Sequence, residues 1–190
     1  MHYLRAEFRN EPRLTLIATD VLKADLSQWG RVTIAGNLPY YITSPILEKT
    51  LALGDRLTHA VFLMQKEVAE RLTAKPGTRE YGFLTVQTQL LSEPEMLLAV
   101  PASAFRPPPK VDSAVVRLIP RSDRTVPDHA AFLKFVSRCF QHKRKKIRNN
   151  LLPFHDRDVL DAIPATAKRA EQLSIPELAD LYERLATSGP

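Results

Sequence analysis

The sequence predicts an α/β protein in which a wound sheet is followed by a small all-helical domain. Short apolar runs at 14–18, 31–35 and 59–64 are rich in β-branched residues and bounded by turn residues, which is typical of strands buried on both faces of a parallel sheet. Helical patterns alternate with these runs, as in wound α/β folds. Strand-like runs cease near residue 122, so we predict two domains, 1–122 and 123–190.

Three helices are expected in the first domain, at 44–53, 66–74 and 81–91. The first should begin with Ser44 as its N-cap and Pro45 at its first helical position.

Two further strands are predicted at the end of the sheet, at 95–100 and 113–119. The connection between them, 101–112, includes the sequence RPPPK. It cannot be helical, because proline lacks an amide hydrogen and restricts the residue before it.

In the second domain Pro127 and Asp128 should open a long helix, with later helices near 156–162 and 175–187. The long helix is predicted to have an apolar face and a basic face at helical spacing. The apolar positions are Phe132, Val136, Cys139, Phe140 and Ile147, and the basic face holds Lys134, Arg138, His142 and Lys145.

Composition indicates an ordinary soluble protein of 190 residues, with 44% hydrophobic and 25% charged residues. No apolar run approaches the ~20 residues of a transmembrane helix, and the first ten residues do not resemble a signal peptide. The single cysteine, Cys139, excludes a disulfide framework or a cysteine metal cluster. We therefore expect a cytoplasmic protein without a metal site or a membrane partner.

The net charge of +6 is concentrated in one segment. Residues 129–155 contain seven Lys or Arg and no Asp or Glu. One interpretation is a solvated helix surface, and the favoured one is a surface that binds phosphates. The basic residues are Lys134, Arg138, Lys143, Arg144, Lys145, Lys146 and Arg148.

The stretch from Asn37 to Tyr40 follows the strand at 31–35, where wound sheets bind ligands. Pro39 restricts Leu38, which can hold the Leu38 carbonyl in one direction beside the Asn37 carboxamide oxygen. Two acceptors suit an exocyclic amine, and Tyr40 offers a face on which a base could stack. The alternative is a strand-ending turn with its tyrosines packed in the core.

Two more residues have a similar double interpretation. Asp20 follows the run at 14–18, where a carboxylate can accept a hydrogen bond from a nucleotide-like cofactor or cap a turn. Phe105 lies in the proline-rich connection, either as a platform for a base or as a buried plug of the loop.

Five segments in this order resemble the ribosomal RNA adenine dimethyltransferases, above all the bacterial small-subunit group. They are NLPYYITSPIL, VFLMQKEVAERL, KPGTREYG, VPASAFRPPPKVDSAVVRL and FQHKRKKIRNNL. The resemblance implies a Rossmann-like class I methyltransferase sheet. It also implies methyl transfer from S-adenosylmethionine to N6 of two adjacent adenosines of small-subunit rRNA, in the rRNA or a 30S precursor.

Site residues follow from this resemblance. Asn37 and the Leu38 carbonyl would hold the target amine, and Pro39 would belong to the same catalytic motif. Tyr40 and Phe105 would sandwich the base. Contacts to the cofactor would come from Asp20, Val21 and Asn37. The residues implied for RNA binding are Lys110, Arg138, Lys143, Arg144, Lys145, Lys146 and Arg148. Thr19 and Tyr41 differ from the residues common at these positions in the family. Neither difference removes an atom that the resemblance assigns to the base or to the cofactor.

A larger departure concerns the glycine loop that wraps the cofactor in this family. No two of the six glycines are separated by a single residue. The chain resembles a family member that lacks its first strands, so we expect impaired cofactor binding and expect 14–18 to rearrange or to pair between chains. The alternative function is a noncatalytic rRNA-binding assembly factor on the same scaffold. A resistance-type enzyme acting on large-subunit RNA is the third interpretation.

Overall fold

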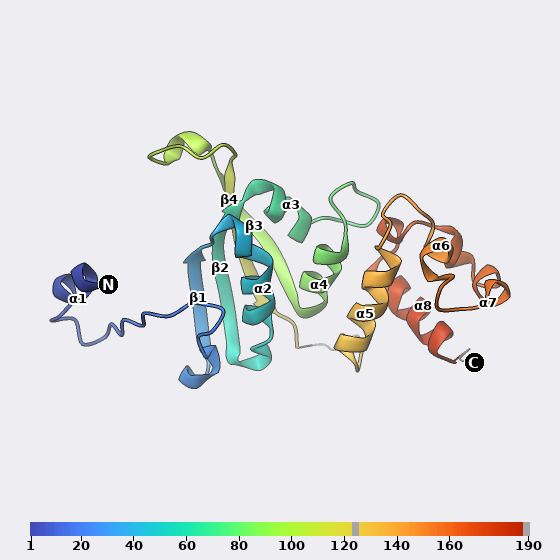
Figure 1. Cartoon of the computed structure of the whole chain (residues 1–190), viewed down its shortest axis with the longest axis horizontal. Coiled ribbons are helices and arrows are strands. Elements are labelled where there is room, and N and C mark those ends of the chain that lie inside the picture. Colours follow the sequence, from blue (N-terminus) through green and yellow to red (C-terminus); the bar gives the residue numbers. More distant parts are fainter. Residues whose placement is uncertain (123–125, 188–190) are drawn as a thin grey trace.

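The computed structural model describes residues 1–122 and 126–187. A four-stranded sheet lies at the centre, helices α5 to α8 lie beyond α4 on one side, and the two termini lie at opposite ends (Figure 1). The strands are β1 (Val32–Asn37), β2 (Leu57–Gln65), β3 (Ser92–Val100) and β4 (Ser113–Pro120). The α-helices are α1 (His2–Glu7), α2 (Thr43–Leu51), α3 (Lys66–Leu72), α4 (Phe83–Leu91), α5 (His129–Cys139), α6 (Ile147–Leu151), α7 (Arg157–Asp161) and α8 (Ile175–Thr187). Short 3₁₀ helices are η1 (Leu26–Trp29), η2 (Tyr40–Ile42), η3 (Gly54–Arg56), η4 (Ala102–Ala104), η5 (Pro164–Ala167) and η6 (Ala170–Gln172).

The sheet has the strand order β1-β2-β4-β3. Strands β1 and β2 are parallel, whereas β4 is antiparallel to both β2 and β3. Phe62 and Met64 of β2 are buried in one cluster with side chains from α2 and α3. Four of the five predicted strands are therefore confirmed, as is the strand pair at the end of the sheet, which proves to be antiparallel. The expected burial of both faces is wrong for β1, in which every second residue is exposed.

The predicted strand at 14–18 is wrong. These residues form no regular structure and pair with no strand in the described ranges. Leu14 and Ile17 remain 43% and 49% exposed. The segment leads away from the sheet to α1, which stands apart and buries none of its residues (Figure 1). An apolar β-branched run favours an extended chain, but a strand also requires a neighbour for its backbone groups. Pairing between chains stays a prediction.

Two details of predicted elements also differ. Helix α2 begins one residue before the predicted N-cap, because Ile42 occupies the cap position and Thr43 is helical. Ser44 is therefore inside the first turn. The proline-rich connection contains the short 3₁₀ helix η4, which lies between Pro101 and the three consecutive prolines at 107–109.

Helix α5 is shorter than the periodicity predicted. Asp128 does cap its start, with a carboxylate oxygen that accepts from the Ala131 amide at 2.9 Å. However, the helix ends at Cys139, so His142 and Lys145 do not share its face with Arg138. The reason is non-local: the Asn150 side chain donates to the Cys139 carbonyl at 2.7 Å and holds the chain in a turn there.

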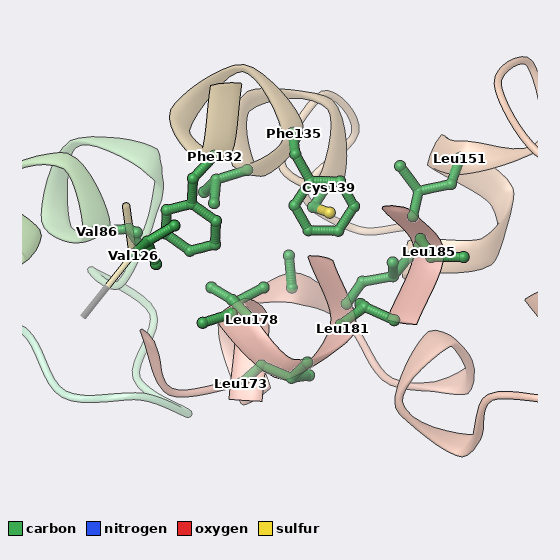
Figure 2. Packing of buried hydrophobic residues seen from close by; sticks show 14 of the residues in the cluster. Val86, Val126, Phe132, Phe135, Cys139, Leu151, Leu173, Leu178, Leu181 and Leu185 are labelled. Atoms are coloured by element: carbon green, nitrogen blue, oxygen red, sulfur yellow. The ribbon is translucent and has the colours of Figure 1, made fainter. Parts of the chain in front are cut away.

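The helical region packs around one core, in which Phe132, Phe135 and Cys139 of α5 face leucines of α8 (Figure 2). Val86 and Leu90 of α4 belong to the same cluster. Helix α4 therefore contributes to the helical core although it precedes the predicted domain boundary. That boundary, between residues 122 and 123, adjoins 123–125, which lie outside the described residues.

Candidate nucleic-acid interface

The turn that follows β1 presents two polar groups from a fixed backbone. Leu38 is buried, and its amide donates to the Leu63 carbonyl at 2.9 Å, which extends the contact with β2 by one residue. Asn37 and Tyr40, on either side of it, are exposed. The buried leucine thus anchors a turn whose neighbouring carboxamide and ring face solvent.

Tyr40 also contacts β4, which lies two strands away from β1 in the sheet. Its hydroxyl lies 3.2 Å from the Ser113 hydroxyl at the start of β4. Ser113 pairs with Gln65, the last residue of β2. The carboxyl ends of β1 and β2 and the start of β4 therefore meet at one edge, and we refer to this edge as the base edge.

Phe105 lies in the connection 101–112, which projects beyond the base edge (Figure 1). The Asp112 carboxylate accepts from the Ala102 amide at 2.9 Å and closes the base of this loop. Phe105 is half-buried and makes no aromatic contact with Tyr40 within the described part of the chain. The structure places both rings at the same edge but does not stack them face to face.

Asp20 and Val21 are not brought to this edge. The Asp20 carboxylate accepts from the Leu22 amide at 2.9 Å, so it caps its own turn. Leu22 accepts from Lys49 Nζ at 2.8 Å. Lys49 is in the last turn of α2, whereas Tyr40 precedes its first turn. Because α2 advances about 1.5 Å per residue, the two turns lie near opposite ends of this helix.

The residues of this chain alone do not fit S-adenosylmethionine. The carboxylate expected to contact its adenine is engaged in a local turn at the far end of α2. The sequence also offers no pair of glycines separated by one residue to enclose the methionine end.

The predicted RNA-binding residues fall mostly in the turn between α5 and α6. We define Lys143, Arg144, Lys145 and Lys146 as the basic turn. All four are exposed. Within the described residues Lys145 and Lys146 form no ion pair, while Lys143 donates to the Arg79 carbonyl.

The other predicted cations are more constrained. The Arg138 guanidinium lies 3.9 Å from the centre of the Phe154 ring. Arg148 pairs with Asp161 at 3.2 Å. Lys110 is exposed in the loop beside the base edge, remote in sequence from the basic turn.

Sequence reasoning missed two cations that join this surface. Lys146 and Arg169 form an isolated antiparallel bridge, and the Ile147 amide donates to the Lys168 carbonyl at 2.9 Å. Lys168 lies 3.5 Å from the Glu177 carboxylate and Arg169 lies 3.8 Å from the Glu171 carboxylate, so both cations have a weak ion-pair partner. The adjacent Lys168-Arg169 pair was the available sequence signal, but its position beside Lys146 depends on the fold.

A hollow of about 890 Å³ lies between α3 and the basic turn. Helix α3, the segment from Gly77 to Thr85 and two residues of the basic turn, Lys143 and Arg144, line it. Glu67 and Glu70 of α3 line this hollow and also the smaller one beside Gln65.

No helix in the described ranges is long and apolar enough to cross a bilayer. Those same ranges contain no group of three or more side chains suited to holding a metal ion.

Solved structures define the class as rRNA methyltransferase-like. A dimethyladenosine transferase from Plasmodium falciparum matches with a TM-score of 0.81 and 24% identity, over 97% of this chain and 77% of that one. The 23S rRNA methyltransferase ErmE matches with a TM-score of 0.69 and 27% identity, over 94% and 77% of the two chains. The predicted fold class is confirmed.

The family follows from sequence comparisons. The model of the family described as Ribosomal RNA adenine dimethylase matches residues 1–187. The protein named Ribosomal RNA small subunit methyltransferase A from Chlorobaculum parvum is 42% identical to this chain, over 92% of this chain and 64% of that protein. The protein of the same name from Chlorobium luteolum is 43% identical to this chain, over 95% of this chain and 66% of that protein. The chain belongs to the ribosomal RNA adenine dimethylase family and spans about two thirds of these relatives' length.

Proposed function

We propose that this chain provides the target-recognition part of a cytoplasmic, S-adenosylmethionine-dependent rRNA adenine N6-dimethyltransferase. Its substrate is the small-subunit rRNA or its 30S precursor, in which two adjacent adenosines receive methyl groups during ribosome biogenesis. Family membership supports the reaction class. The single observation that carries the assignment is the exposed Asn37 carboxamide beside Tyr40 on a turn anchored by buried Leu38.

The base edge performs the recognition step. The Asn37 side-chain oxygen and the Leu38 carbonyl accept hydrogen bonds from the adenine amine, which orients its lone pair and increases its nucleophilicity. Tyr40 stacks on the extruded base, while its hydroxyl remains tied to Ser113. Phe105 closes on the other side of the base when the loop moves inward. Orientation of the amine is the main contribution of these residues to the rate.

The basic turn, Lys110 and the Lys168–Arg169 pair hold the RNA backbone. They supply unpaired or weakly paired cations at positions separated along the surface. Such contacts position RNA through its phosphates without reading sequence. Base selection and backbone attachment are therefore assigned to different parts of the chain.

The methyl donor would be S-adenosylmethionine, but the residues present do not form its site, so we assign no step of transfer to this chain alone. Weak or absent cofactor binding is the expected result. The competing function is a noncatalytic rRNA-binding assembly factor on the same scaffold.

Two measurements test the proposal. Calorimetric titration with S-adenosylmethionine should show no micromolar binding, while filter binding should show that the chain retains the 3′-terminal RNA of the small subunit. A methyl-transfer assay on purified small subunits separates the two functions when a full-length relative carries Asn37→Ala at the equivalent position. Loss of transfer with RNA binding retained supports recognition of the target amine. Unchanged transfer refutes the role of Asn37.

A further inference from the structure

A second carboxamide, that of Gln65, lies on the same sheet face as Asn37. Asn37 pairs with Leu63 of β2, so their side chains share one face, and alternation returns Gln65 to that face two residues later. The burial pattern agrees, because Phe62 and Met64 are buried while Leu63 and Gln65 are partly exposed.

The spacing between these two residues follows from sheet geometry. One strand separation of about 4.8 Å and two residue rises of about 3.3 Å place Asn37 and Gln65 roughly 8 Å apart. A single-stranded RNA can direct two neighbouring bases to such points when the bases are unstacked.

Gln65 opens into a hollow of about 450 Å³ beside the base edge. The hollow lies next to Ser113, which contacts the Tyr40 hydroxyl. Asp112 precedes Ser113 in the chain, Gln65 pairs with Ser113, and both of these neighbours line the hollow. The lining residues are Gln65, Lys66, Glu67, Glu70, Lys110, Val111 and Asp112.

Most polar groups of this hollow already have partners. Glu67 pairs with Arg71, and Lys66 lies 3.9 Å from Glu70. Within the part of the chain that the structure describes, the Gln65 carboxamide makes no hydrogen bond, and Lys110 makes no ion pair. The groups left for a ligand are thus one amide and one cation.

We infer that this hollow is a subsite for the nucleotide next to the target adenosine, and that Gln65 selects adenine there. The inference rests on the proposed function. A glutamine side chain can accept from the adenine N6 amine and donate to N7 in a bidentate pair. Lys110 neutralises the adjoining phosphate, and the exposed side chain of Val111 offers apolar contact to the base.

This site disfavours guanine. The O6 and N7 atoms of guanine are both acceptors, whereas the glutamine amide can direct only one donor group at them. Asn37 and Gln65 would therefore act as two adenine-selecting amides on neighbouring strands, one for each of two adjacent bases.

The test measures binding of labelled six-nucleotide RNAs to the 190-residue chain by fluorescence anisotropy. Wild type should bind UUAAUU about 5- to 10-fold more tightly than UUAGUU or UUGAUU, the lower part of the range for a bidentate pair. Gln65→Ala should reduce the preference over one of the two guanine-containing RNAs to less than about 2-fold, and leave the preference over the other, which depends on Asn37. Gln65→Glu, which retains the shape but removes the donor, should do the same.

Gln87→Ala is the matched control, because Gln87 bonds Glu48 on the surface of α4, away from the hollow. It should leave the preference unchanged. Lys110→Ala should weaken all three RNAs equally. Circular dichroism confirms that each variant is folded.

The outcomes separate the two proposals. The subsite is refuted, while the RNA function stands, if wild type binds, the basic-turn variant Lys145→Ala with Lys146→Ala binds more weakly, and Gln65→Ala retains the full preference over both guanine-containing RNAs. Equal affinity of wild type for all three RNAs likewise refutes the subsite. If wild type binds none of these RNAs and no small-subunit RNA, both proposals fail.

Discussion

Asn150 determines where helix α5 ends, and replacing it should test this directly. Its side chain is 2% exposed, and its amide donates to the Cys139 carbonyl at 2.7 Å. A second contact, to the His142 carbonyl, is 3.4 Å long and therefore weak. The change Asn150→Ala removes both donors and leaves a buried carbonyl without this partner.

The expected cost follows from these contacts. Loss of a partner from a buried polar group costs about 1–3 kcal/mol. The Asn150 side-chain oxygen has no partner of its own, and its removal offsets part of this loss. We therefore expect Asn150→Ala to lower the free energy of unfolding by about 2 kcal/mol, or the melting temperature by about 4–8 °C for a chain of this size.

The substitution Asn150→Asp separates hydrogen bonding from packing. It keeps the shape but places an acceptor against the Cys139 carbonyl, so its cost should exceed that of Asn150→Ala and reach about 3 kcal/mol or more. Asn149→Ala is the control, because Asn149 is exposed on the same helix.

Urea unfolding and thermal melting followed by circular dichroism measure these effects. RNA binding at 20 °C, where the variants remain folded, should weaken for Asn150→Ala and not for Asn149→Ala, because Asn150 also fixes the start of the basic turn. Equal stability of Asn150→Asp and wild type would refute the assignment of the amide as the donor that ends α5.

Three further predictions concern other contacts. Tyr40→Phe should lower the free energy of unfolding by about 0.5–1.5 kcal/mol in urea titration, since it loses the hydroxyl contact to β4, whereas Tyr41→Phe at an 87% exposed position should be neutral. Burial raises the pKa of Tyr81 to about 12, so the stability of wild type should fall as pH rises from about 10, where the unfolded tyrosine ionises, to 12. Tyr81→Phe should reduce that loss, while the part due to Cys139, whose pKa burial also raises to about 12, should remain. Without the unpartnered hydroxyl, the variant should also gain up to about 1 kcal/mol at pH 8; an unchanged alkaline profile would contradict this. Replacing Lys145 and Lys146 by Ala should reduce the slope of log affinity against log salt by about 1.4–1.8 in filter binding, and an unchanged slope would exclude phosphate contact.

Local patterns were sufficient for most elements of the fold. Apolar runs and turn residues predicted four strands and the helices around them, because periodicity and capping depend on near neighbours in sequence. The same patterns misplaced 14–18, whose composition is that of a strand although it has no sheet partner. They also extended α5 beyond Cys139, since the apolar spacing continues to Ile147 while Asn150 ends the helix from a distance.

The sequence by itself determined the chemistry available to this protein: the Asn37–Tyr40 turn, the concentration of positive charge and the membership of its family. Only the tertiary structure decided which of these groups lie together. It joined Tyr40 to Ser113, placed Arg169 opposite Lys146 and left Asp20 at the far end of α2. The physical reason is that these contacts connect residues distant in sequence, and their formation depends on strand register and helix packing rather than on local preference.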